Sequence, residues 1–164
     1  MKNLILIRHG KSSWEAPLSD IDRPLSAKGI KDALYISSEI LSILPKKYLV
    51  WSSIAKRTQE TSYIFAQNMQ FPIENIIFRN DLYTFDVSQL TKIIKTCDTN
   101  IDNLIVFGHN DAITNFVNQF GNNKIEHVPT SGLIHIQFET TCWQKIKKGK
   151  IVNLFFPKKI ERYK

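Results

Sequence analysis

The chain has 164 residues, of which 43% are hydrophobic, and its formal net charge is +7. This length fits one domain, residues 1–164, with enough apolar residues for a buried core. A membrane span needs about eighteen uninterrupted apolar residues, and no such run is present. The first apolar run, residues 4–7, is too short for a signal peptide, so we expect a cytoplasmic protein without a membrane partner.

The positive charge is concentrated at the C-terminal end of the chain. From Trp143 onward there are eight Lys or Arg residues and one acidic residue, Glu161, whereas residues 1–142 hold fourteen of each charge. No stacking-aromatic motif surrounds this terminal excess, so we expect no nucleic-acid partner. We interpret the segment as a solvated basic edge, and a docking patch for an acidic partner is the alternative.

Apolar runs and helical spacing alternate along the chain. Ser26 is the expected N-cap of the first helix, and Asp86 or Ser88 is that of the third. The alternation predicts an α/β fold, a three-layer α/β/α sandwich around a mixed, mostly parallel sheet with an antiparallel edge. The expected elements in chain order are a strand at 4–7, a helix at 28–44, a strand at 48–51, a helix at 56–69, a strand at 76–78, a helix at 87–96, a strand at 104–107, a helix at 111–120, a hairpin of strands at 133–138 and 144–146, and a further strand at 151–155.

Two of the apolar strands end in a histidine flanked by glycine. The first ends in Arg8-His9-Gly10 and the other in Gly108-His109-Asn110. In an open α/β sheet, ligands bind outside the carboxyl ends of the strands, and glycine there lets a ligand approach the backbone closely. We therefore expect both histidines at one edge of the sheet, facing a ligand.

Arg57 adds a cation to the same edge. It falls in the first turn of a helix that begins after the strand at 48–51. A guanidinium donates paired hydrogen bonds to phosphate, and a helix N-terminus also favours an anion. Taken alone, Arg57 is typical of a surface residue, but beside Arg8, His9 and His109 it predicts a phosphate pocket.

A larger set of segments occurs in a fixed order along the chain. Its members are Arg8-His9-Gly10, Lys11-Ser12-Ser13-Trp14, Asp22-Arg23-Pro24-Leu25-Ser26, Ser52-Ser53, Arg57-Thr58-Gln59-Glu60-Thr61, Gly108-His109-Asn110 and Val128-Pro129-Thr130-Ser131-Gly132. This set resembles the histidine phosphatase superfamily, with its phosphoglycerate mutase-like fold. Within that superfamily it is most similar to the small SixA-type phosphohistidine phosphatases. The likeness runs from residue 3 to about residue 158.

The resemblance implies a metal-independent mechanism without a cofactor. His9 would attack phosphorus to form a covalent phosphohistidine, which water then hydrolyses. Arg8, Arg57 and His109 would hold the phosphoryl oxygens. Because nearby arginines disfavour a charged imidazole, we expect His9 to be unprotonated and activity to fall before pH 4 as it protonates.

Three further residues carry a phosphate-binding interpretation and a structural one. Arg23 reaches the phosphate in the resembled group, or it fixes its loop by pairing with Asp20 or Asp22. Asn110 contacts phosphate, or it caps the helix that follows. Ser12 donates a hydrogen bond to phosphate, or it has only a role in its loop.

The chain lacks an obvious general acid. Thr84 stands where many superfamily members carry Glu, and the nearby candidates are Asp81 and Asp86, of which Asp86 is also the expected helix cap. A phosphorylated imidazole needs less proton donation than an alkyl phosphoester. The favoured substrate is therefore protein phosphohistidine. A broad phosphatase of small phosphorylated molecules, or a non-catalytic phosphate- or phosphoprotein-binding module, is the alternative.

The remaining histidines and cysteines show no spacing typical of a metal site. Cys97 and Cys142 are far apart in the sequence, which predicts two free thiols. His127 and His135 have no partner at metal-ligand spacing, so we expect structural roles for both and no bound metal.

Overall fold

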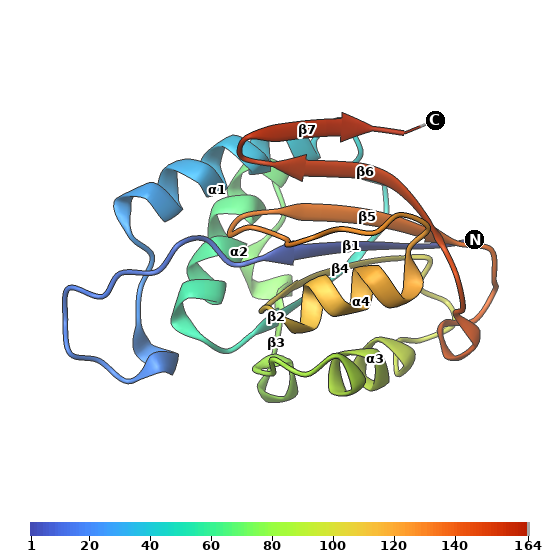
Figure 1. Cartoon of the computed structure of the whole chain (residues 1–164), viewed down its shortest axis with the longest axis horizontal. Helices are drawn as coiled ribbons and strands as arrows, with labels where there is room; N and C mark the ends of the chain where they lie inside the picture. Colours follow the sequence, from blue (N-terminus) through green and yellow to red (C-terminus); the bar gives the residue numbers. More distant parts are fainter. Residues whose placement is uncertain (164) are drawn as a thin grey trace.

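One sheet of seven strands runs through the protein (Figure 1). The computed structural model describes residues 1–163. The strands are β1 (Lys2–Arg8), β2 (Leu49–Ser53), β3 (Ile77–Arg79), β4 (Asn103–Gly108), β5 (Leu133–Phe138), β6 (Lys150–Phe156) and β7 (Lys159–Arg162). They lie in the order β3-β2-β4-β1-β5-β6-β7, in which β3 to β1 are parallel and β5 to β7 pair antiparallel. The predicted mixed sheet is confirmed.

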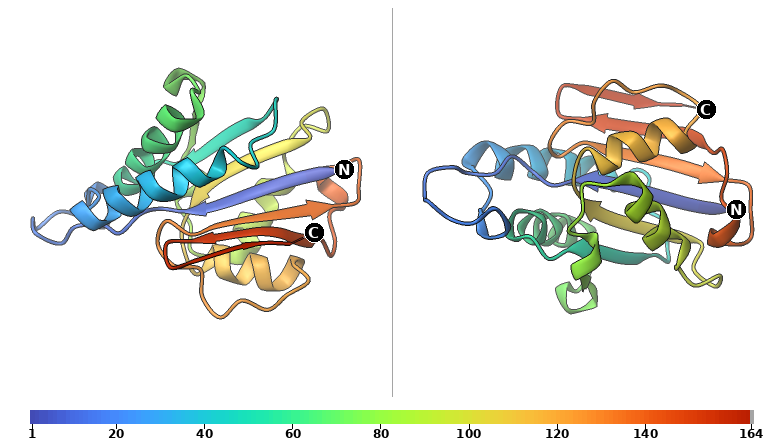
Figure 2. Two further views of the ribbon diagram at one scale, coloured as in Figure 1. Left: turned by 90° about the horizontal axis from the view of Figure 1, so that it is seen from above. Right: turned by 60° about the horizontal axis from the view of Figure 1, so that its bottom comes forward.

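Helices cover both faces of the sheet. They are α1 (Ala27–Ile40), α2 (Lys56–Met69), α3 (Val87–Lys95) and α4 (Ala112–Phe120). Figure 2 shows α1 and α2 on one face and α3 and α4 on the other. In the stretch of chain that the structure describes, none of these helices has the length and apolarity to cross a membrane. The predicted three-layer sandwich is confirmed.

Alternate residues of the central strand supply the two halves of the core. Ile5 and Ile7 pack with buried residues of α1 and α2. Leu4 and Leu6 pack with buried residues of α3 and α4. Successive side chains of a strand point to opposite faces, so a strand that is apolar throughout requires cover on both sides. This burial fixes β1 in the middle of the sheet.

The predicted helix caps are confirmed, but α1 is shorter than predicted. Ser26 Oγ accepts a hydrogen bond from the Gly29 backbone N–H, and the Asp86 side chain caps α3 in the same way. The predicted helix at 28–44 ends at Ile40. Ser42 Oγ donates to the Glu39 carbonyl at 2.8 Å, and such side-chain bonds compete with the helical hydrogen-bond ladder.

The predicted hairpin of residues 133–138 and 144–146 is wrong in its second strand. Residues Trp143–Lys145 form a 3-10 helix, and β5 pairs instead with β6. The apolar pattern there arises because the Trp143 side chain is buried and donates through Nε1 to the Ile101 carbonyl at 2.7 Å. The basic C-terminal segment adds β7, which the sequence did not predict, at the edge of the sheet.

Candidate active site

The two histidines meet at the carboxyl end of the parallel strands. His9 follows β1 and His109 follows β4, and the parallel register of these strands aligns Arg8 with Gly108. The two imidazole rings lie 5.1 Å apart between centroids. The expectation that both histidines stand at one sheet edge is therefore confirmed.

His9 is held in a fixed orientation and tautomer. Its Nδ1 lies 2.6 Å from the Gly10 carbonyl oxygen, which accepts the Nδ1 proton. Arg57 Nε donates to His9 Nε2 at 3.3 Å, so Nε2 carries the lone pair. Only 8% of His9 is exposed. The ring thus presents an unprotonated nitrogen beside a guanidinium.

A side chain at position 10 would disturb this arrangement. A Cβ on Gly10 would lie 3.0 Å from both the Gly29 carbonyl oxygen and Leu25 Cδ2. The Gly10 backbone N–H donates to Thr61 Oγ1 on α2 at 2.9 Å. Glycine here lets the loop after β1 pass close to both α1 and α2, which fixes the carbonyl that orients His9.

Arg57 connects the two histidines. It lies in the first turn of α2, is 2% exposed, and its Nη2 is 3.5 Å from His109 Nδ1. Its Nη1 donates to the Asp20 carbonyl at 2.6 Å, and its Nη2 donates to Asp20 Oδ2 at 3.0 Å. The structure therefore brings together His9, Arg57 and His109 as predicted.

His109 is oriented by the end of β2. Its Nε2 lies 2.8 Å from Ser53 Oγ, which also accepts from the Ala55 backbone N–H at 3.2 Å. Because a guanidinium only donates, the Arg57 contact assigns the lone pair of His109 to Nδ1 and the proton to Nε2. Tyr83 and Phe85 pack edge-on against the ring. His109 Nδ1 faces the space shared with His9.

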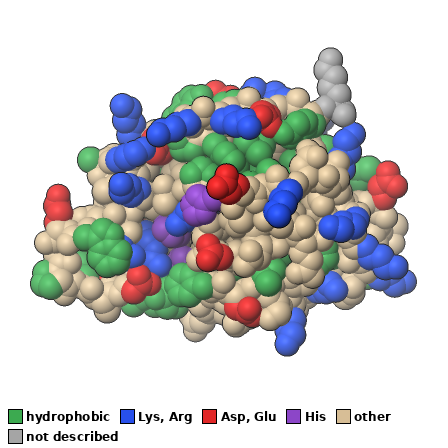
Figure 3. All heavy atoms as spheres, viewed as in Figure 1, with side chains coloured by type: hydrophobic (Ala, Val, Ile, Leu, Met, Phe, Trp, Pro, Cys, Tyr) green, Lys and Arg blue, Asp and Glu red, His purple; other side chains and the backbone are tan. Residues whose placement is uncertain are grey.

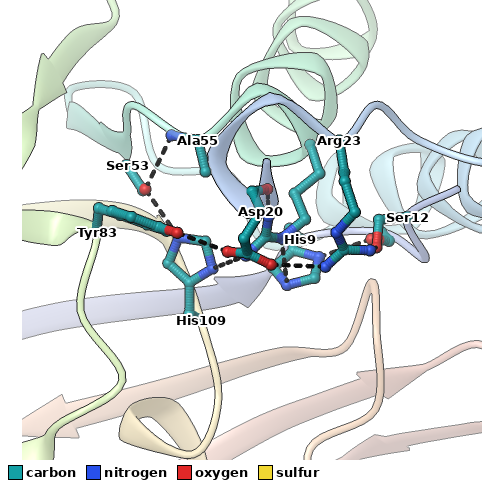
Figure 4. A network of polar contacts seen from close by, with 10 residues as sticks. His9, Ser12, Asp20, Arg23, Ser53, Ala55, Tyr83 and His109 are labelled. Carbon is teal, nitrogen blue, oxygen red and sulfur yellow. Dashed lines mark hydrogen bonds and ion pairs between the residues drawn. The ribbon is translucent and has the colours of Figure 1, made fainter. Parts of the chain in front are cut away.

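Asp20 is a site residue whose position the sequence did not predict (Figure 4). Its carboxylate accepts from Arg57, from Arg23 Nη2 at 2.9 Å, and from the Tyr83 hydroxyl at 2.6 Å. Arg23 also donates to Ser12 Oγ, and it stacks on the exposed Trp14 ring 3.5 Å from the centroid. The pairing with Asp20 thus brings Arg23 into the histidine network.

Arg8 and Asn110, which flank the two histidines in the sequence, meet at the Val128 carbonyl. Arg8 Nη1 donates to the Val128 carbonyl at 3.0 Å and lies 3.2 Å from His127 Nε2. Asn110 Nδ2 donates to the same carbonyl, while its Oδ1 accepts from the Thr114 backbone N–H at 3.0 Å. Asn110 thus satisfies a backbone N–H in the first turn of α4, although the N-cap position itself is held by Asp111. His127, for which we expect a structural role, contacts both Arg8 and Asn110.

Burial and neighbouring cations keep both histidines neutral. Loss of hydration, together with Arg57, Arg8 and Arg23, lowers the pKa of His9 to about 3. Burial, His9 and Arg57 lower the pKa of His109 to about 2. At neutral pH both rings hold an unshared electron pair, as a nucleophile at His9 requires.

The network contains a carboxylate, but it is poorly suited to donate a proton. Burial opposes ionisation of Asp20, yet the hydrogen bonds from Tyr83, Arg23 and Arg57 hold its pKa far below the ordinary value. Asp20 therefore remains ionised at neutral pH.

The acids suggested by the sequence are engaged elsewhere. Both Asp81 oxygens accept from Arg79, at 3.0 and 2.8 Å. Asp86 accepts from Ser88 Oγ and caps α3. Thr84 is buried and its Oγ1 donates to Gln89 Oε1 at 3.1 Å. The structure brings neither Asp81 nor Asp86 into the hydrogen-bond network of the two histidines.

The polar groups of the site suit an anion. Between residues 1 and 163, no group of three or more His, Cys, Asp or Glu side chains is placed to hold a metal ion. In the same stretch, Arg8 Nε, Arg23 Nε and Ser131 Oγ are buried without a hydrogen-bond partner from the protein. A buried donor without a partner is costly, and phosphoryl oxygens would satisfy such donors. Ser131 joins the site because its backbone N–H donates to the His9 carbonyl at 3.0 Å.

Comparison with known proteins places the chain in one protein family. The model of the histidine phosphatase superfamily (branch 1) matches residues 4–97, which is more than half of the chain. An uncharacterized chloroplastic protein of Arabidopsis thaliana is 35% identical over 118 residues, which cover 66% of this chain and 54% of that protein. The matched part thus spans about half the length of this relative.

Solved structures share the whole fold at low identity. The protein histidine phosphatase SixA complexed with tungstate has a TM-score of 0.79 at 16% identity, covering 94% of this chain and 97% of its own. A mycobacterial glucosyl-3-phosphoglycerate phosphatase has a TM-score of 0.67 at 10% identity, covering 99% of this chain and 98% of its own. These likenesses show the fold, and their substrates differ.

Proposed function

Because the chain belongs to the histidine phosphatase superfamily, we propose that it hydrolyses phosphohistidine on proteins, with His9 as the nucleophile. The observation that carries this proposal is the buried, neutral His9, whose Nε2 faces Arg57 at 3.3 Å and whose ring lies 5.1 Å from that of His109. A nucleophile, its orienting carbonyl and its oxyanion donors are thus in one cluster.

The reaction would proceed in two displacements at phosphorus. His9 Nε2 forms a bond to phosphorus while the P–N bond of the substrate breaks, and the electron pair leaves with the substrate imidazole. Water then attacks the phosphorylated His9, releases inorganic phosphate and restores the neutral ring. Arg8 and Arg57 would donate to the phosphoryl oxygens in both steps, which is the main requirement of phosphoryl transfer. His109 would join them only by taking up a proton at Nδ1, which holds a lone pair in the free protein.

The state of Asp20 supports a nitrogen leaving group. An alkoxide must be protonated as it leaves, and general acid catalysis contributes about 10²- to 10⁴-fold. Asp20 is held ionised by Arg23, Arg57 and Tyr83, so it has no proton to give at neutral pH. An imidazole that already carries a proton leaves as a neutral ring without such help. This favours phosphohistidine over alkyl phosphoesters.

Phosphorylated small molecules are the second candidate substrate class. The likeness to the mycobacterial glucosyl-3-phosphoglycerate phosphatase favours it, because the same fold acts there on a phosphorylated sugar acid. The likeness to SixA, which is named as a protein histidine phosphatase, favours phosphohistidine proteins as the substrate, and its TM-score is the higher of the two. A site that binds phosphate without hydrolysing it is the remaining alternative.

One set of rate measurements separates these functions. The kcat/KM of the protein is compared for a phosphohistidine protein, an activated aryl phosphate and a sugar phosphate, each with and without a chelator. We expect the phosphohistidine protein to be hydrolysed best, no effect of the chelator, and a phosphorylated His9 after rapid quenching in an alkaline denaturant, in which the N–P bond is stable. Faster hydrolysis of the sugar phosphate would favour the small-molecule function, and phosphate binding without any turnover would overturn an enzymatic role.

A further inference from the structure

A second cavity lies beside the site, on the far side of His127. It has a volume of about 280 Å³ and opens between the first turn of α1, the loop before β5 and the turn from β6 to β7. Figure 3 shows Lys and Arg side chains on both sides of an apolar surface next to the histidines. The charged residues of the lining are Lys28, Asp32, Lys158 and Lys159, and Phe156 provides an apolar wall.

The lining carries an excess of positive charge. Lys28 pairs with Asp32 at 2.7 Å, and Lys159 pairs with Glu161 at 2.8 Å. Lys158 is exposed and forms no ion pair with any residue in the described part of the chain. The cavity therefore offers an apolar wall and a free ammonium group, which suits a carboxylate on a short aliphatic stem.

His127 forms a shared wall between this cavity and the phosphate pocket. It lines the cavity, and its Nε2 lies 3.2 Å from Nη1 of Arg8. A group bound beside Lys158 and a phosphoryl group held by Arg8 would both lie next to His127. Both groups can therefore belong to one substrate.

We propose that this cavity binds an acidic side chain of the substrate protein, close in space to its phosphohistidine. The inference rests on the proposed function and names its substrate class, an acidic phosphohistidine segment. The volume is below the range of about 300–1,000 Å³ typical of sites for whole small ligands, and it suits one side chain. Part of the basic C-terminal segment, Lys158 and Lys159, thereby contributes to substrate recognition.

The test uses a series of phosphohistidine peptides of one length. Each carries a single Glu in place of Gln, at one position from four residues before to four residues after the phosphohistidine. We expect Glu at one or two positions to lower KM about fivefold with kcat nearly unchanged, since the contact is made equally in the ground and transition states. Lys158→Glu should abolish this preference.

Lys147→Glu is the matched control. Lys147 is also an exposed lysine beside a cavity, but it lies in the loop between β5 and β6, at the opposite end of the sheet from His9 (Figure 1). This variant should keep the preference for Glu. Equal KM values for all peptides in the wild type, or the same loss in both variants, would overturn the acidic subsite.

Hydrolysis of an aryl phosphate by the same proteins reports the catalytic site separately. The wild type and both variants should hydrolyse it at the same rate, because it carries no group for the cavity. If the wild type hydrolyses the aryl phosphate and all peptides without preference, only the subsite is overturned. If it hydrolyses neither the aryl phosphate nor the peptides, the proposed function is overturned as well.

Discussion

Two buried histidines in different parts of the protein have the same exposure but different hydrogen-bond partners. His9, at the carboxyl end of β1, and His135, in β5, are each 8% exposed. Burial is the first cause of a lowered pKa in both, to about 3 for His9 and about 4 for His135. Neither burial nor pKa therefore distinguishes the proposed nucleophile, His9, from His135.

The partners of the two rings make the difference. His135 Nε2 lies 2.9 Å from Asn3 Oδ1, and Asn153 Nδ2 lies 2.9 Å from His135 Nδ1, so amides saturate both nitrogens. His9 uses Nδ1 for the Gly10 carbonyl and shares Nε2 only with a guanidinium at 3.3 Å. We propose that a bound phosphoryl group draws Arg57 towards its own oxygens and frees that nitrogen for attack. This contrast yields four predictions.

Replacing each histidine in turn gives the largest contrast. We expect His9→Ala to lower kcat on an aryl phosphate about a thousandfold or more, because the covalent route is lost. His135→Gln should change kcat less than about threefold, since it alters a satisfied pair of hydrogen bonds in the antiparallel half of the sheet. If both variants remain folded by circular dichroism and lose kcat to a similar extent, the hydrogen-bond partners of the two rings would not explain which of them is reactive.

Arg57 tests the electrostatic part of the site. Arg57→Gln should lower kcat by about 10²- to 10³-fold, the usual effect of removing one donor to a developing oxyanion. It should also move the acid limb of the pH–rate profile upward, because the guanidinium helps to lower the pKa of His9. Arg79→Gln, which breaks a pair with Asp81 away from the histidine network, is the control and should change neither quantity.

The pKa of His9 bears on the pH dependence expected from the sequence. Arginines near His9 predicted a neutral ring with activity lost before pH 4. The lowered pKa, about 3, agrees with a neutral ring, and burial contributes more to it than the arginines, so we expect activity to fall only in strong acid, which a pH–rate profile measures. Sequence reasoning gave the right direction but could not measure desolvation.

Elements with strong local signals were predictable from the sequence. The helix at 56–69 and the strand at 133–138 match α2 and β5 at both ends. The predicted strand at 144–146 failed because Trp143 is buried by tertiary packing in a 3-10 helix. β7 was missed because Lys159–Arg162 is a short edge strand rich in charge, which lacks an apolar pattern.

The residues of the candidate site also differ in how well the sequence predicts their positions. His9, His109 and Arg57 follow or begin regular elements, so topology alone brings them to one edge. Asp20 and His127 lie in long connections between regular elements, and their side chains contact Arg57 and Arg8. In such connections no periodicity predicts the direction of a side chain. For Asp20 the only signal was its candidate pairing with Arg23, which the structure confirms at 2.9 Å.

The Asp20 carboxylate accepts a hydrogen bond from Arg57, and we propose that bound phosphate competes with it for this donor. Asp20→Asn removes a negative charge that pairs with Arg57, which we propose holds phosphate, and with the neighbouring Arg23. We expect inorganic phosphate to bind about tenfold more tightly, as measured by inhibition of aryl phosphate hydrolysis. Asp22→Asn, which removes an exposed charge two residues away, should leave the inhibition constant unchanged. Unchanged or weaker phosphate binding in Asp20→Asn would show that the carboxylate does not compete for this site.

The smallest expected effect concerns stability in acid, where the two histidines should behave alike. A ring whose folded pKa lies below its unfolded value near 6.5 takes up a proton on unfolding, so the stability that it confers is full above pH 6.5 and decreases as pH falls towards the folded value. For His135, with a folded pKa of about 4, this predicts a loss of about 1 kcal/mol or more between pH 7 and pH 5.

His135→Gln should remove that part of the pH dependence, and urea unfolding at pH 7 and pH 5 measures it. We propose that residues 1–164 form one domain, so each curve should show a single transition. His9→Gln should flatten the pH dependence in the same direction, since its ring is equally buried. If only His9→Gln flattened it, the two rings would differ in solvation and not only in their partners, and the explanation of reactivity by hydrogen-bond saturation would have to be replaced.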